Sequence, residues 1–177
     1  MTAKSIGEAI RRAREYLRQR PDEAISADSA ATATVEAGLR CRVTGPQGQV
    51  LVSDMTTAVG GGASAPSPGW LMRASHAACD ATLIAMRAAE EDIVLSRLEV
   101  AVDSDSDDRG LLGMDDVTPA GPIRTRVRVI IAAPGVSEEK LRELVEWARE
   151  HSPVDDAMQR AVPVGVEVAT GAPGPPL

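Results

Sequence analysis

The chain has 177 residues, enough for one domain with its own core, and 44% of them are apolar. A formal net charge of -7 without any long Lys/Arg run argues against a nucleic-acid partner, and only Trp70, Trp147 and Tyr16 are aromatic, too few for base stacking. Residues 1–20 lack the apolar segment of a secretory signal, and no stretch approaches membrane-span length, so we expect a cytoplasmic protein without a membrane partner.

The first predicted element is a helix over residues 5–20. Ser5 and Glu8 have the spacing of a capping box, and apolar residues then recur at helical intervals until Pro21 ends the pattern. Strands are predicted within residues 29–54, where Leu39, Cys41 and Val43 alternate with Arg40 and Arg42. A Gly-Pro-Gln-Gly turn separates two of these strands, which indicates a β-hairpin.

Helices and strands mix in the rest of the chain. The Gly/Ala/Ser/Pro-rich segment 55–68 contains three successive glycines, but it lacks both phosphate-binding motifs, which favours a flexible surface loop. The later elements are predicted to be a long helix (69–91), two strands (94–104 and 122–132), a helix capped by Ser137 (137–150), a helical turn (154–160) and a last strand (Val162–Val168). This order indicates the α+β class.

The acidic connection at 103–119 begins like a calcium-binding loop, with aspartates at alternate positions. Asp108 stands where that loop requires glycine, and Met114 stands where it requires a bidentate glutamate. We therefore expect a solvated connection rather than a calcium site, with Leu111 and Leu112 packed against the core.

The long helix has three stripes of side chains at helical spacing. One consists almost entirely of alanines, which allow another helix backbone to approach closely. The second is polar and consists of Arg73, His76, Asp80 and Arg87. The third carries the thiol and consists of Met72, Ser75, Cys79, Thr82 and Met86.

Cys79 is the strongest candidate for chemistry, although a free cysteine is commonly a small buried apolar residue. His76 and Cys79 have a possible metal-ligand spacing, but His151 is the only other histidine and a closed site needs four ligands. A Cys-His protease signature is also missing. We expect no metal and no cofactor.

A family resemblance strengthens the case for Cys79. The run PSPGWLMRASHAACDATLIAMRA, followed by LSRLEVAV, resembles the helix-and-strand signature of the OsmC/Ohr family. The match is carried by Pro68, Leu71, Ala77, Ala78 and Cys79. The resemblance implies antiparallel sheets wrapped around long central helices in an intertwined homodimer. It divides the chain into an N-terminal helical extension (1–24) and an OsmC-like domain (25–170), and the Gly/Pro-rich composition of residues 171–177 predicts a disordered tail.

The resemblance also implies a thiol peroxidase, in which Cys79 attacks a peroxide and becomes a sulfenic acid. The family supplies an activating arginine from an early strand, where Arg40 and Arg42 are the nearest counterparts, and Arg73 is a weaker candidate. Beside Cys79, the substrate pocket is expected to be lined by Trp70, Met72, Ser75, Thr82 and Met86.

Two departures from the family pattern leave two functions open. The carboxylate expected just before the helix is replaced by Gly69 and Trp70, and the second cysteine is replaced by Ser152. Cys41 is expected to pack in the core instead. Either Cys79 reduces a small apolar hydroperoxide and is recycled by an external thiol, or the protein binds a small apolar ligand without catalysis.

Overall fold

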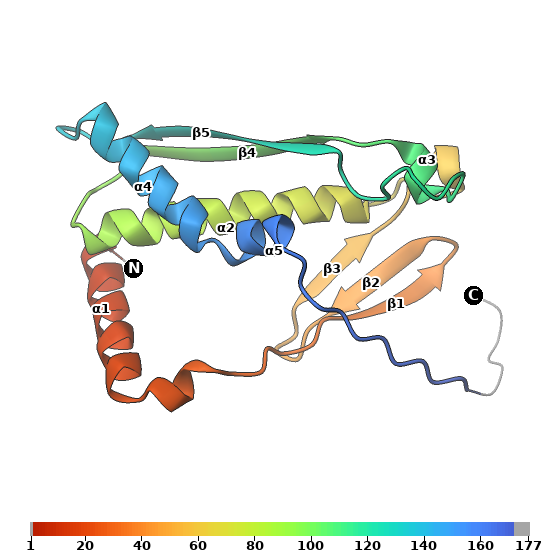
Figure 1. The fold of residues 1–177 in the computed structure, drawn as a ribbon, viewed down its shortest axis with the longest axis horizontal. Coiled ribbons are helices and arrows are strands. Elements are labelled where there is room, and N and C mark those ends of the chain that lie inside the picture. Colours follow the sequence, from red (N-terminus) through yellow and green to blue (C-terminus); the bar gives the residue numbers. More distant parts are fainter. Residues whose placement is uncertain (1, 172–177) are drawn as a thin grey trace. The chain divides into compact units, whose positions relative to one another are not determined.

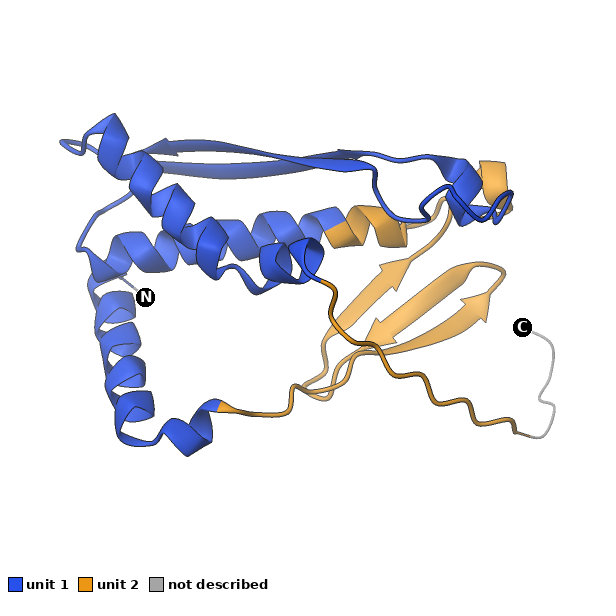
Figure 2. Cartoon of the chain, viewed as in Figure 1, with its two compact units in different colours: residues 1–24, 73–160 blue, residues 25–72, 161–177 orange. Residues whose placement is uncertain are grey.

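The computed structural model describes residues 2–171 and confirms the α+β class. The chain divides into two compact units (Figure 2): unit 1 comprises residues 1–24 and 73–160, and unit 2 comprises residues 25–72 and 161–177. The elements, whose α-helices and β-strands are labelled in Figure 1, are α1 (Ala3–Gln19), η1 (Pro21–Ala24), β1 (Thr32–Ala37), β2 (Arg40–Thr44), β3 (Val50–Ser53), η2 (Thr57–Val59), α2 (Pro68–Glu90), β4 (Arg97–Asp105), α3 (Asp108–Leu111), β5 (Arg124–Ala132), α4 (Glu138–His151) and α5 (Pro153–Gln159).

Helix α1 begins earlier than predicted, because Thr2 and Ser5 form the capping box in place of Ser5 and Glu8. Its first turns pack against the end of α2, where Gly7 is buried. A Cβ atom on Gly7 would lie 2.3 Å from the carbonyl oxygen of Ala89, so only glycine permits this approach.

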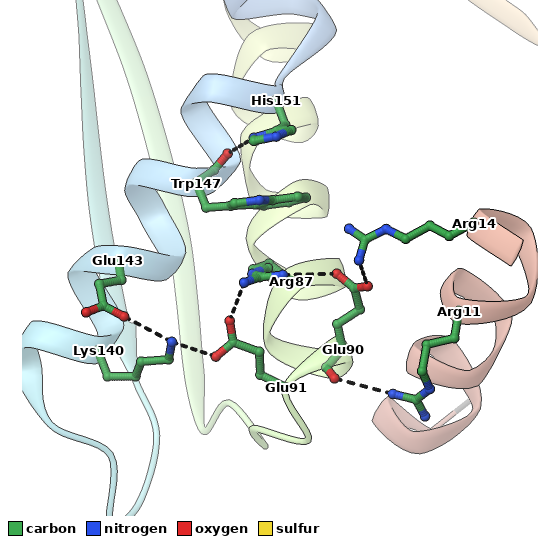
Figure 3. Close-up of polar contacts among 9 residues, drawn as sticks. All are labelled: Arg11, Arg14, Arg87, Glu90, Glu91, Lys140, Glu143, Trp147 and His151. Atoms are coloured by element: carbon green, nitrogen blue, oxygen red, sulfur yellow. Dashed lines mark hydrogen bonds and ion pairs between the residues drawn. The ribbon is translucent and has the colours of Figure 1, made fainter. Parts of the chain in front are cut away.

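The end of α2 is also where α1 makes its polar contacts (Figure 3). Arg11 donates a hydrogen bond from Nη1 to the Glu90 carbonyl oxygen at 3.3 Å, and Arg14 forms an ion pair with the Glu90 carboxylate. Cations beside the last carbonyl groups of a helix are favourable there.

Helix α2 starts and stops at recognisable signals. The Ser67 hydroxyl accepts a hydrogen bond from the Trp70 N–H at 3.3 Å, and Pro68 occupies the first turn, where its missing N–H costs nothing. Beyond the helix, Asp92 adopts a left-handed φ of 56°. In the described part of the chain, no helix has both the length and the apolar character that crossing a membrane requires.

The core of unit 1 forms where α2, α4 and β5 meet. Ala88 of α2 clusters with Leu141 and Leu144 of α4, and Ile131 of β5 packs against them. Lys140 pairs with Glu91 at 2.7 Å and strengthens the same junction (Figure 3).

A stack of side chains fixes the C-terminal half of α4. The guanidinium of Arg87 lies 5.0 Å from the ring centroid of Trp147, and the Trp147 and His151 rings stack with their centroids 4.2 Å apart (Figure 3). The His151 Nδ1–H donates to the Trp147 carbonyl oxygen at 2.7 Å. The stack therefore positions the junction between α4 and α5, where Ser152 lies.

Strands β4 and β5 form a two-stranded antiparallel ladder, which Figure 1 shows running alongside α2. Arg73 of α2 donates to the Ser104 hydroxyl of β4 at 3.2 Å. The expected packing of Leu111 and Leu112 is wrong, because both are more than half exposed. Asp107 caps the short helix α3 that carries Leu111, and this leaves the leucines on the solvent side.

Unit 2 contains a three-stranded antiparallel sheet in the order β1-β2-β3. The predicted hairpin is confirmed between β2 and β3. Leu39 does not join the strand alternation, since it lies in the turn after Gly38, whose φ is +56°. Among the described residues of unit 2, no hydrophobic side chain is buried.

The predicted last strand, Val162–Val168, is absent within the chain. Its alternate valines are 45% to 84% exposed, and the segment has no secondary structure. Alternation predicts the tendency to form a strand, but a strand also needs a neighbour to accept its hydrogen bonds. Residues 172–177 of the predicted tail lie outside the described residues.

Candidate functional site

Cys79 lies in the middle of α2, half-buried, and its thiol meets the junction of α4 and α5. The hydroxyl of Ser152 donates a hydrogen bond to the Cys79 Sγ at 3.3 Å. Ser152 is only 1% exposed, and it is the N-cap of α5, where its Oγ accepts from the Asp155 N–H at 3.3 Å. The residue that stands in place of the expected second cysteine therefore does meet Cys79.

The chemistry of this contact differs from that of a thiol pair. A hydroxyl can donate to a thiolate and stabilise it, since hydrogen bonds to charged groups are stronger than neutral ones. It cannot form a disulfide with an oxidised Cys79. Both cysteines of the chain are free.

The polar stripe predicted on α2 divides into two parts. Arg73 and Arg87 are half-buried and engage neighbouring elements, whereas His76 and Asp80 are almost fully buried. His76 faces both Asp80 and Asp155 of α5, a residue that the sequence analysis did not select. In the described part of the chain, no group of three His, Cys, Asp or Glu side chains is arranged to hold a metal ion.

The two candidate arginines lie on β2 in unit 2, two positions apart and therefore on the same face of the strand. Both pair with Glu36, at 3.4 Å from Arg40 and 2.5 Å from Arg42. The hydrogen bond from Arg42, the largest cause, lowers the pKa of the Glu36 carboxyl. Arg40 also donates from Nη1 to the Ser64 hydroxyl at 2.7 Å.

Ser64 belongs to a polar network in the glycine-rich segment, which is more ordered than predicted. The Asp54 carboxylate accepts from the Ser64 N–H at 3.0 Å, from its hydroxyl at 2.8 Å and from the Gly62 N–H at 3.3 Å. The Ser64 backbone N–H makes the largest contribution to lowering the pKa of Asp54. Arg40 is therefore oriented by Glu36 directly and by Asp54 through Ser64, although positions 69 and 70 carry no carboxylate.

The expected pocket residues all lie on α2, but their exposure differs. Met72 and Met86 are half-buried, Ser75 and Thr82 are exposed, and Trp70 is 51% exposed. A hollow of about 510 Å³ lies elsewhere in unit 1, between β5 and α4, and none of the expected pocket residues lines it. The pocket assignment stays a prediction.

Comparison with known proteins connects this geometry with one family. The sequence profile described as OsmC-like protein matches residues 60–167, more than half of the chain. No curated protein matches at a comparable level.

Solved structures share the fold at low sequence identity. An OsmC-like protein from Mycoplasma pneumoniae is 15% identical, with a TM-score of 0.64 over 76% of this chain and 89% of its own. An organic hydroperoxide resistance protein from Legionella pneumophila is 22% identical (TM-score 0.56; 76% and 91% covered), and another from Elizabethkingia anophelis is 20% identical (0.57; 77% and 91%). The profile match and the shared fold lead to one conclusion: this chain belongs to the OsmC-like family.

Proposed function

We propose that the protein is a thiol peroxidase that reduces small apolar hydroperoxides through Cys79. The thiolate attacks the outer peroxide oxygen, the O–O bond breaks, and the alkoxide leaves and takes up a proton to become an alcohol. Cys79 is left as a sulfenic acid. An external thiol then displaces water to form a mixed disulfide, and a second external thiol releases Cys79 and forms a disulfide with the first.

The contact between Ser152 and Cys79 is the observation that carries this proposal. A half-buried thiol that meets a polar donor at 3.3 Å differs from a cysteine packed among hydrocarbon groups. The donor favours the thiolate, which is the form that attacks peroxides. Because serine cannot resolve the sulfenic acid, the proposal requires an external thiol, and a reducing cytoplasm suits that requirement.

In this proposal Arg40 supplies the activating cation. Its two anchors, Glu36 and Ser64, restrict the guanidinium more than the single anchor of Arg42 does. Arg40 is also the less exposed of the two, at 35% against 45%. A fixed cation is the arrangement that a thiolate needs.

The proposal includes a homodimer. A three-stranded sheet without buried apolar side chains is marginal in water, and the valines of 162–168 pair with no strand among the described residues. A second copy would cover these surfaces. Light scattering on a size-exclusion column should give twice the chain mass, and a concentration-independent monomer would contradict this part.

The alternative is an OsmC-like protein that binds a small apolar ligand without turnover. Ser152 favours it, because the residue that meets Cys79 at this position is a serine, which cannot form a disulfide. Consumption of cumene hydroperoxide in the presence of dithiothreitol separates the two functions. The peroxidase consumes it catalytically and loses this activity in Cys79→Ser but keeps it in the matched control Cys41→Ser; equal consumption by the wild type and Cys79→Ser would refute the peroxidase.

A further inference from the structure

A buried charged cluster lies next to the Cys79 contact and has no part in the steps above. His76 and Asp80 are one turn apart on α2, and Asp155 is in the first turn of α5. His76 Nε2 lies 3.4 Å from Asp80 Oδ2 and 3.5 Å from Asp155 Oδ1. The three side chains are only 3%, 1% and 8% exposed.

The charges in this cluster explain why it holds together. Two buried carboxylates are costly unless cations balance them. His76 lies between them and balances one of them when it is protonated, and Arg149 of α4, with Nε 3.5 Å from Asp155 Oδ2, balances the other. These separations are long for hydrogen bonds, and both Asp80 oxygens lack a hydrogen-bond partner among the described residues, so attraction between charges dominates. Arg73, also on α2, donates to Ser104 of β4.

Asp155 connects this cluster to the thiol through a short chain of contacts. Its backbone N–H donates to the Ser152 Oγ, and the Ser152 hydroxyl donates to the Cys79 Sγ, both at 3.3 Å. Because the Ser152 oxygen accepts on the Asp155 side, its single proton is directed to the sulfur. The Asp155 side chain anchors the same turn of α5 to His76.

We propose that His76, Asp80 and Asp155 form a clamp that holds α5 against α2 and thereby aims the Ser152 hydroxyl at the Cys79 thiolate. The three are positioning residues that act through Ser152. This inference rests on the proposed function in one respect only: peroxide reduction is the use that it assigns to the stabilised thiolate. The clamp and its effect on the thiol can be measured without peroxide.

The test follows the alkylation rate of Cys79 by iodoacetamide against pH in a Cys41→Ser background. Asp155→Asn releases the clamp and should move the half-maximal rate to higher pH by about one unit, as expected for loss of a hydrogen bond to a charged group. The negative charge of Asp155 by itself would have the opposite effect. Removing a negative charge near Cys79 favours the thiolate and would lower the pH of the half-maximal rate. An unchanged or lower midpoint would therefore overturn the clamp.

Asp156→Asn is the matched control, because Asp156 lies in the same first turn of α5 but is exposed and paired with Arg160. It should leave the midpoint pH unchanged. A shift equal to that of Asp155→Asn would refute the clamp, because any change of charge in α5 would then have the same effect. Asp80→Asn serves as a second variant with the same sign argument, should Asp155→Asn not fold.

A double-mutant cycle tests whether the clamp acts through Ser152. Ser152→Ala should raise the midpoint, and adding Asp155→Asn to it should change nothing further. Additive shifts, or no shift in Ser152→Ala, would refute the inference. If these alkylation shifts are found but Cys79 proves slow toward hydroperoxide, the clamp stands and only the peroxidase proposal fails.

Discussion

Replacing Ser152 by cysteine should give the chain an intramolecular disulfide with Cys79. The two side-chain tips already lie 3.3 Å apart within unit 1, so the bond needs side-chain rotation rather than movement of a helix. In the reduced state the variant loses the N-cap of α5, at a cost of about 1 kcal/mol. In the oxidised state the bond closes a loop of about 73 residues, which the chain-entropy model values at about 4 kcal/mol.

The assay exposes the reduced variant to one equivalent of cumene hydroperoxide and then counts free thiols and measures the intact mass. We expect loss of two thiols and of two hydrogens per chain, with Cys41 still free, and an oxidised form about 4 kcal/mol more stable in urea than the reduced form of the same variant. The Cys41→Ser, Ser152→Cys double variant should react in the same way. Retention of both thiols, or bonding only between chains, would refute the geometry at Cys79.

Three further predictions concern stability. Leu144→Ala should lower the free energy of unfolding by about 2–5 kcal/mol in urea, because Leu144 is 1% exposed in the core; a loss below that range would show that the core is loose. Gly7→Ala should cost about 1–3 kcal/mol and speed proteolysis around α1, since its Cβ meets the Ala89 carbonyl, and unchanged proteolysis would contradict this docking. Asp54 has a lowered pKa, so its stabilisation of the Ser64 turn is complete above about pH 4 and is lost as the pH falls through the folded value; hydrogen exchange should show Ser64 N–H protection lost at low pH, and retained protection would contradict the assignment.

Local sequence patterns predicted the elements that local interactions stabilise. The long helix, the turn between β2 and β3 and the Ser137 cap all depend on residues close in sequence. The segment 162–168 has the right alternation, but no strand in residues 2–171 pairs with it. Pairing between strands is a long-range property, which alternation alone does not encode.

The site was only partly predictable. The family resemblance identified Ser152, because this serine occupies the position of the family's second cysteine, and Ser152 does contact Cys79. The anchors of Arg40 were missed, because the carboxylate was sought just before α2. Glu36 of β1 pairs with Arg40 directly, and Asp54, just before the glycine-rich segment, acts through the Ser64 hydroxyl.

His76 and Asp80 were placed on a polar stripe, and nothing in the helix itself showed that Asp155 would bury them. Arg73 stands three residues before His76, so the stripe looked like an ordinary solvated face. Their partner comes from 75 residues further along the chain, since Asp155 follows Asp80 by that interval. Such a separation is beyond the reach of helical periodicity.

The central claim is that Cys79 is held as a reactive thiolate. Stopped-flow mixing of the reduced protein with cumene hydroperoxide at pH 7 measures this directly, with Cys79→Ser as the blank. Full ionisation alone makes a thiol about thirtyfold more reactive than free cysteine at this pH. We therefore predict that the second-order rate constant of the protein exceeds that of free cysteine by more than this factor, and that the reaction is absent in Cys79→Ser. A rate equal to that of free cysteine, or a fast phase that survives in Cys79→Ser, would contradict the account.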